Sequence, residues 1–133
     1  MSRRRARERL LGLLYQREFI DTPLEEQLAG LKRGEQYDYI RRVLTGIVNH
    51  QAEIDSLIAK KTIGWRFERL ALIDRNILRL GVFELLYLPE VPPQVAIDEA
   101  VELCKQYGTD RAREFVNGIL DRLWKERPKI TSQ

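Results

Sequence analysis

Apolar residues recur along most of this chain at spacings of three and four, the pattern typical of helices with one buried face. No segment shows the apolar and polar alternation of a half-buried strand. The chain is therefore predicted to be all-α, with about seven helices and no sheet. These helices are expected over about residues 4–20, from 22–25 to a glycine at 30 or 34, and over 35–61, 65–72, 73–88, 93–107 and 111–127.

Several residues at the helix boundaries have side chains suited to capping. Thr22 is a candidate cap, Pro23 suits the first helical position, and Glu25 completes a capping box. Gly108 is expected to end the helix over 93–107, and Asp110 to cap the last one. These capping residues support the helix boundaries that the apolar spacing predicts.

The chain has 133 residues, a length typical of one domain. A loop around residues 61–66 separates an N-terminal bundle of about 1–62 from a C-terminal bundle of about 65–127. Neither half alone would bury much surface, so we expect the two bundles to share one core. Gly81 and Gly118 stand inside helical stripes, where we expect another helix to pack closely against them.

Positive charge is concentrated at the N-terminus. The first nine residues contain five arginines and one glutamate, a charge of +4, whereas the whole chain carries +3. The other 124 residues therefore sum to −1. A basic edge on a nearly neutral body suits a polyanion, and nucleic acid is the first candidate because each neutralised phosphate releases a counterion. A solvated basic tail without a partner is the alternative.

The composition excludes several classes of protein. No apolar run approaches the roughly 20 residues that cross a bilayer. The apolar segment after the arginines is too short for a signal peptide, and charged residues follow it too closely. The single Cys104 cannot form an internal disulfide and fits a reducing compartment. We therefore expect a cytoplasmic protein that does not enter a membrane.

Side chains suited to catalysis or metal binding are scarce. The single His50 lies in a polar patch, where we expect a surface or packing role, and Cys104 continues an apolar stripe. Neither a GxxxxGK[ST] nor a GxGxxG phosphate loop is present. We expect no catalytic constellation, no metal site and no cofactor.

Three stretches, in this order and register, resemble the NusB transcription antitermination family over nearly the whole chain. They are RRRARE at 3–8 followed by LYQ at 14–16, DRNILRLGVFEL at 74–85 followed by a proline turn and VAIDEAVEL at 95–103, and FVNGILD at 115–121. The resemblance implies an all-helical fold of two perpendicular bundles. It also implies a non-catalytic factor that binds single-stranded boxA RNA with a small ribosomal subunit protein, NusE, within an RNA polymerase antitermination complex.

The resemblance assigns roles to seven residues. Arg3, Arg4 and Arg7 match the arginine-rich RNA-binding motif. Because Arg3 and Arg7 continue the stripe of Leu10 and Leu14, we expect them at the edge of the bundle. The remaining four are Phe115 as a base-stacking platform, Arg111 beside it, and Tyr15 and Asp74 at the partner surface.

Alternatives remain open for several of these roles. Phe115 could be a core phenylalanine, Tyr15 a half-buried aromatic, and Asp74 a helix cap. Asp98 departs from the family pattern and would repel RNA if it faced the ligand. The function also has alternatives: an accessory domain of an RNA-modifying system, or a homodimer that hides the basic surface.

Overall fold

The computed structural model describes residues 1–62 and 66–127. In this part of the chain it contains seven α-helices, one short 3-10 helix and no strand, which confirms the predicted all-α fold of about seven helices. The α-helices are α1 (Arg3–Gln16), α2 (Leu24–Ala29), α3 (Tyr37–Asn49), α4 (Gln51–Lys61), α5 (Leu72–Tyr87), α6 (Pro93–Tyr107) and α7 (Ala112–Lys125). The 3-10 helix covers Phe67–Arg69.

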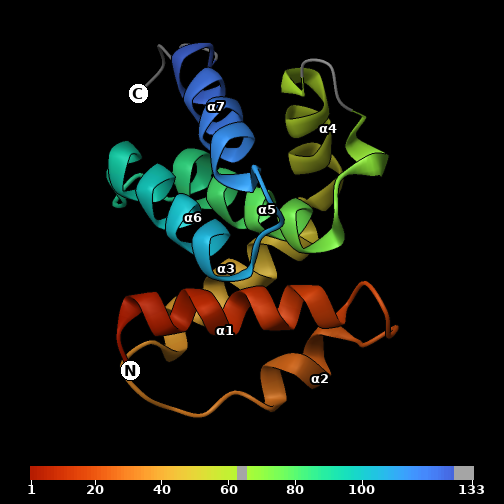
Figure 1. Ribbon diagram of the computed structural model, residues 1–133. Helices are drawn as coiled ribbons and strands as arrows, with labels where there is room; N and C mark the ends of the chain where they lie inside the picture. Colours follow the sequence, from red (N-terminus) through yellow and green to blue (C-terminus); the bar gives the residue numbers. More distant parts are fainter. Residues whose placement is uncertain (63–65, 128–133) are drawn as a thin grey trace.

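Helix α5 is the centre of the molecule. It lies against α1, α3, α4, α6 and α7, and the buried apolar residues of all these helices form one cluster. Figure 1 shows α1 running crosswise below the upright helices α4 and α7, with α5 and α6 between them. The helices of both halves therefore pack around one core.

The sequence of α5 explains its central place, because apolar residues occur all around it. Ile77, Leu78, Leu80 and Val82 are almost fully buried. A helix that is apolar on every side must be covered on every side. The glycine prediction at Gly81 is confirmed, since a Cβ there would lie 2.9 Å from Leu120 Cδ1 and 3.3 Å from Ala100 Cβ.

One buried arginine of α5 connects three parts of the chain. Arg79 donates from Nε to Asp55 of α4 at 2.7 Å, and from Nη1 to Glu18 at 2.6 Å. Its side chain is only 6 % exposed. Burial disfavours its charged form, but the two carboxylates outweigh this cost and raise the pKa of Arg79. The residues just after α1 are thus tied to α4 through α5.

The predicted helix over 35–61 is wrong, because the structure divides it at His50. The backbone of His50 has φ −115° and ψ 16°, outside the helical region, and α4 leaves α3 there. His50 Nδ1 lies 2.9 Å from the Gly46 carbonyl oxygen. The break lets Ile54 and Ile58 reach the core with α4 packed against α5 and α7.

Other boundaries also differ from the prediction. Helix α1 ends at Gln16 instead of near residue 20, and the expected helix over 65–72 is reduced to one 3-10 turn. The Thr22 hydroxyl donates to the Ile20 carbonyl and does not cap α2. Asp110 does not cap α7, which follows Arg111 in a left-handed conformation with φ 70°. Residue 65, where the helix over 65–72 was predicted to begin, lies outside the described residues.

Gly118 does not have the predicted role of admitting a neighbouring helix. A Cβ there would meet only the Arg122 Nη1 atom of the same helix, at 3.3 Å. Gly46, which was not predicted, has that role, because its Cβ would fall 2.2 Å from Phe83 Cζ. Within the described residues, no helix is both long enough and apolar enough to cross a bilayer.

Candidate nucleic-acid interface

The arginine-rich segment forms the first two turns of α1. Ser2 caps the helix, its hydroxyl accepting from the Arg5 backbone N–H at 3.1 Å. Arg3 is exposed; its Nε donates to Gln36 Oε1 at 2.7 Å and its guanidinium lies 3.9 Å from the ring centroid of Tyr39. The helix is therefore formed from its start, and Arg3 lies against α3 with its edge open to solvent.

Arg4 is exposed but paired. Its Nη2 and Nε donate to the two carboxylate oxygens of Glu99 on α6, at 2.9 and 3.2 Å, while its side chain remains 54 % exposed. The hydrogen bond from Arg4 and the positive charges of Arg7 and Arg4 lower the pKa of Glu99, against a smaller effect of burial. A phosphate that binds Arg4 through this fork must therefore compete with Glu99.

Arg7 is buried, so the prediction that it lies at the bundle edge is wrong. Its Nε donates to both oxygens of Glu84 at 2.9 and 3.2 Å, and Nη1 lies 3.4 Å from Glu99. Tyr39 donates its hydroxyl proton to the same Glu84 at 2.6 Å. Only 5 % of Arg7 is exposed. Arg7 therefore fixes α1 to α5 and α3, and has no surface to offer a ligand.

The pKa values within this cluster reflect burial and charge together. Burial, and then the negative charge of Glu84, raise the pKa of Tyr39, so its hydroxyl stays protonated and donates. For Arg7 burial opposes the charge, yet the hydrogen bond and charge of Glu84 outweigh it and raise the pKa. Sequence reasoning missed Glu84 and Tyr39. The available signal was a glutamate inside the apolar run LGVFELL at 80–86.

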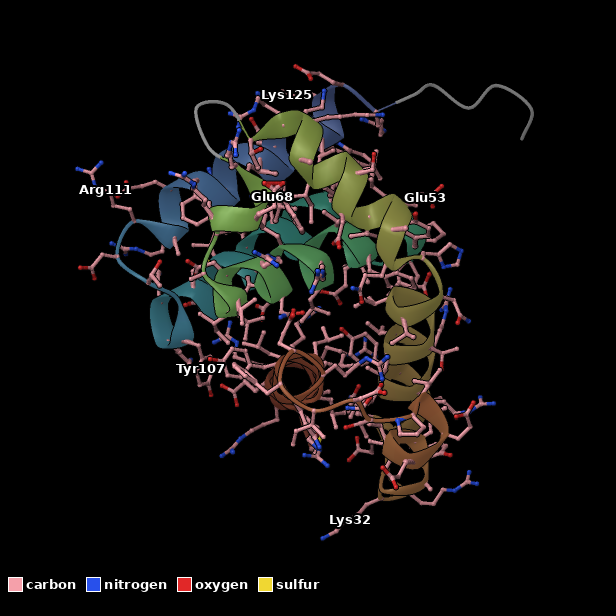
Figure 2. All side chains as sticks on the ribbon, turned by 90° about the vertical axis from the view of Figure 1, so that its right-hand side faces the viewer. Lys32, Glu53, Glu68, Tyr107, Arg111 and Lys125 are labelled. Atoms are coloured by element: carbon pink, nitrogen blue, oxygen red, sulfur yellow. The ribbon has the colours of Figure 1, made fainter. Side chains whose placement is uncertain are left out.

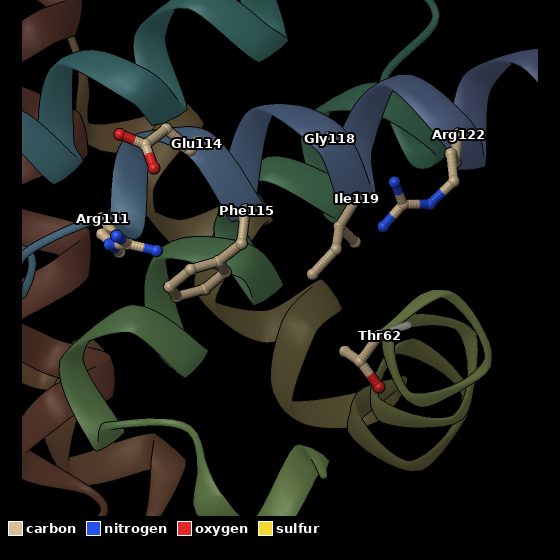
Figure 3. Close-up of a pocket in the computed structure, with 7 residues that line it drawn as sticks. All are labelled: Thr62, Arg111, Glu114, Phe115, Gly118, Ile119 and Arg122. Atoms are coloured by element: carbon tan, nitrogen blue, oxygen red, sulfur yellow. The ribbon is translucent and has the colours of Figure 1, made fainter. Parts of the chain in front are cut away.

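Arg111 and Phe115 lie together at the start of α7, as predicted. They line a pocket of about 370 Å³ with Glu114, Gly118, Ile119, Arg122 and Thr62. Figure 3 shows Arg111 and Phe115 next to each other, with Arg122 farther along the helix. Phe115 is half-buried and packs against the core, so its ring combines a packing role with access to this pocket.

The structure does not bring all predicted RNA-binding residues to one place. Arg3 and Arg4 contact α3, α6 and the segment before α3, whereas the Phe115 pocket is built from α7 and the end of α4. Between them, α6 and α7 border a shallow groove of about 320 Å³ that includes Lys105, Arg113 and Asp98. Asp98 is exposed and accepts a hydrogen bond from Gln94 at 2.8 Å.

Tyr15 lies on an exposed apolar surface. It is 38 % exposed and makes an edge contact with Phe19, whose ring centroid lies 4.9 Å away. A groove of about 410 Å³ runs from Tyr15 to Ile73 and Tyr107. Figure 2 shows Tyr107 projecting from the body beside α1, which is viewed end-on. Exposed aromatic residues around a groove are typical of protein–protein contact surfaces.

Asp74 is not on that surface. It is 1 % exposed, and its carboxylate accepts from the Thr109 backbone N–H at 3.1 Å and from the Thr109 hydroxyl. The carboxylate thus holds the turn between α6 and α7 against the start of α5. A partner at the surface would meet Asp74 only through this turn.

The side chains considered for chemistry are placed as follows. Cys104 is buried, and burial raises the pKa of its thiol to about 12, far from a reactive thiolate. His50 is exposed, with its ring 5.1 Å from that of Tyr87. The described residues contain no group of three His, Cys, Asp or Glu side chains that could hold a metal ion.

Comparison with known proteins agrees with this architecture. The sequence profile of the NusB family matches residues 4–125. The chain belongs to the NusB family. It is 40 % identical over 131 residues to the transcription antitermination protein NusB of Myxococcus xanthus, covering 92 % of this chain and 94 % of that protein.

Solved structures of NusB proteins superpose on the same helices. T. maritima NusB matches with a TM-score of 0.87 and 41 % identity, covering 95 % of this chain and 92 % of that one. A structure of antitermination factors NusB and NusE in complex with dsRNA matches with a TM-score of 0.77 and 32 % identity. That match covers 94 % of this chain and 98 % of the other.

Proposed function

We propose that this protein is a transcription antitermination factor that binds boxA-type RNA together with the ribosomal protein NusE and promotes processive transcription by RNA polymerase. The observation that carries the proposal is the pair of exposed arginines, Arg3 and Arg4, on the first turn of α1 in a NusB-family chain. The planar guanidinium of an arginine can donate two parallel hydrogen bonds to one phosphate. Such contacts orient RNA without reading its bases.

Arg3 and Arg4 differ in whether a carboxylate already neutralises their charge before RNA binds. Arg4 is held by Glu99, so a phosphate gains Arg4 only by displacing a carboxylate that is already there. Arg3 has no carboxylate partner among the described residues and keeps its guanidinium in place on Tyr39. Arg7 helps to position Arg3 and Arg4, because its ion pair with Glu84 fixes α1 to α5. Phe115 stays a predicted stacking platform, with Arg111 beside it for a neighbouring phosphate.

The groove at Tyr15 is the surface we assign to NusE. Its Tyr15 lies near the C-terminal end of α1, whereas Arg3 and Arg4 lie at the N-terminal end, so RNA and the protein partner can bind at once. The solved relative that contains both NusE and RNA supports this pairing of partners. Asp74 serves this surface indirectly, because it holds Thr109, two residues beyond Tyr107, in place.

The test is fluorescence anisotropy with a boxA-like RNA and a scrambled control, with and without NusE. We expect a preference for boxA that sharpens when NusE is added. The variant Arg3→Ala/Arg4→Ala should bind about tenfold more weakly, and its slope of log affinity against log salt should be smaller by about 1.4, the value for two single-strand phosphates. Its helical circular dichroism should be unchanged.

Three outcomes would contradict parts of this proposal. Equal binding to both RNAs, unaffected by NusE, would reject the antitermination function. A dimer in sizing experiments that binds no RNA would favour self-association through the basic surface. Unchanged RNA affinity in a folded Phe115→Ala variant would reject the stacking role. The matched control is Lys60→Ala/Lys125→Ala, which removes two exposed charges at the far ends of α4 and α7.

A further inference from the structure

A second basic surface lies on the other side of α1 from Glu99. The segment 30–37, which joins α2 to α3 and includes the first residue of α3, returns beside the N-terminus, as Figure 1 shows. Between this segment and α1 lies a cleft of about 500 Å³, which we call the loop cleft. Its lining includes Arg9, Lys32, Arg33, Gln36, Tyr37 and Ile40.

The cations of the loop cleft are not neutralised by the protein. Arg9, Lys32 and Arg33 face one carboxylate in the lining, Glu35, and none of the three forms an ion pair within the described part of the chain. A concave surface on which positive charge predominates focuses the field and attracts a polyanion. The cleft therefore differs from the other side of α1, where Arg4 and Arg7 are paired with glutamates.

The loop cleft is continuous with the start of α1. Gln36, one of its lining residues, accepts the hydrogen bond from Arg3 Nε at 2.7 Å. Arg3 thus stands between Arg4 on the α6 side and the cleft on the α3 side. A strand whose phosphates contact Arg4 and Arg3 would enter the cleft if it continued in the same direction.

The side chains of the cleft suit a sugar-phosphate backbone better than bases. The guanidinium of Arg33 lies 4.2 Å from the ring centroid of Tyr37, so one face of this aromatic ring is already covered. Arg9 and Lys32 are exposed cations on two separate segments, and most hydrogen bonds from such side chains to nucleic acids go to phosphates, which carry no sequence information. Binding here should be independent of sequence and sensitive to salt.

We propose that the loop cleft binds the phosphate backbone of the RNA that flanks the boxA element, through Arg9 and Lys32, with Arg33 held on Tyr37 beside them. This inference rests on the proposed RNA-binding function and extends its footprint along the transcript. The flanking RNA adds affinity without adding sequence preference.

The experiment compares a core boxA-like RNA with the same RNA extended by about eight nucleotides, a length within the footprint of single-strand binding grooves. Extensions are made at the 5′ or the 3′ end, from uridine or from adenosine. With wild-type protein, extension at one end should tighten binding about five- to tenfold at low salt, equally for both bases. Arg9→Ala/Lys32→Ala should lose this gain, reduce the salt slope for the extended RNA by about 1.4, and bind the core RNA as wild type does.

The control is again Lys60→Ala/Lys125→Ala, which removes the same charge at a distance; Figure 2 shows Lys32 and Lys125 at opposite edges of the molecule. The proposal is overturned if extension gives no gain, if the control loses the gain equally, or if the Arg9→Ala/Lys32→Ala variant keeps it. Failure of wild-type protein to bind the core RNA would instead reject the proposed function. Unchanged circular dichroism shows that each variant is folded.

Discussion

The two sides of α1 carry arginines in opposite electrostatic states. On the side facing α5 and α6, Arg7 and Arg4 are paired with Glu84 and Glu99. On the side facing segment 30–37, Arg9 has no carboxylate partner among the described residues. Counting arginines therefore overstates the charge that the first side offers to RNA and understates the importance of the second. The paired arginines mainly fix the position of α1, whereas the unpaired arginine is free to attract phosphates.

The strongest way to separate the two sides is to remove one arginine from each. Among the described residues, Arg7→Ala leaves the buried Glu84 with only Tyr39 as a hydrogen-bond partner, and we expect a loss of about 3–5 kcal/mol in the free energy of unfolding. Arg9→Ala, on an exposed residue, should change it by less than about 0.5 kcal/mol. Urea denaturation of both variants measures the difference.

The double variant Arg7→Met/Glu84→Gln tests the cause. The glutamine carbonyl can still accept the Tyr39 hydroxyl proton, and no charge is left buried alone. We expect this variant to recover most of the lost stability, since replacing a buried ion pair is often nearly neutral. If Arg7→Ala unfolds no more readily than Arg9→Ala, the two sides of α1 do not differ as described.

A smaller effect is expected when the paired side is made to resemble the unpaired one. Glu99→Gln removes the carboxylate that competes with phosphate for Arg4, so RNA affinity should rise roughly two- to fivefold at low salt. The measurement is anisotropy with the core RNA, and Glu102→Gln on the same helix is the control. Unchanged affinity for Glu99→Gln would mean that Arg4 does not take part in binding.

The smallest expected effect is the change in folding stability at acidic pH. The pKa of Glu99 is lower in the folded protein than its ordinary value, so its ion pair contributes stability above that ordinary value and loses it as pH falls through the lowered one. Wild type should therefore exceed Glu99→Gln in stability near neutral pH, and the two should converge as the pH falls below the ordinary pKa of a glutamate and through the lowered pKa of Glu99. Because Arg4 is more than half exposed, the difference is small. A gap that widens in acid would contradict this assignment.

The sequence predicted the helices better than their ends, and the surface residues better than their partners. Apolar spacing located α5 and α6 within a residue or two. It could not show the break at His50, because the polar residues 49–51 fit an exposed helical face as well as they fit a turn. The break follows from how α4 packs on α5 and α7, which is information from distant parts of the chain.

The same limit applies to the candidate site. Helical spacing placed Arg3 and Arg7 at the edge of the bundle, in line with Leu10 and Leu14. Only the fold shows that Arg7 is buried against Glu84, 77 residues later, while Arg3 remains exposed. The loop cleft had no signal in the sequence, because its cations come from two segments whose closeness depends on the path of residues 30–37. Asp74 illustrates the reverse: a residue matched to the partner surface is enclosed by a turn.

Because of the ion pairs of Arg79, we expect that neither half of the chain folds stably on its own. A fragment of residues 66–127 would carry this guanidinium without Asp55 or Glu18, and a fragment of residues 1–62 would carry both carboxylates without it. Each half therefore keeps a charge that only the other half can compensate. Two such fragments, expressed separately, should be weakly structured alone and should reassemble on mixing, as a split protein does.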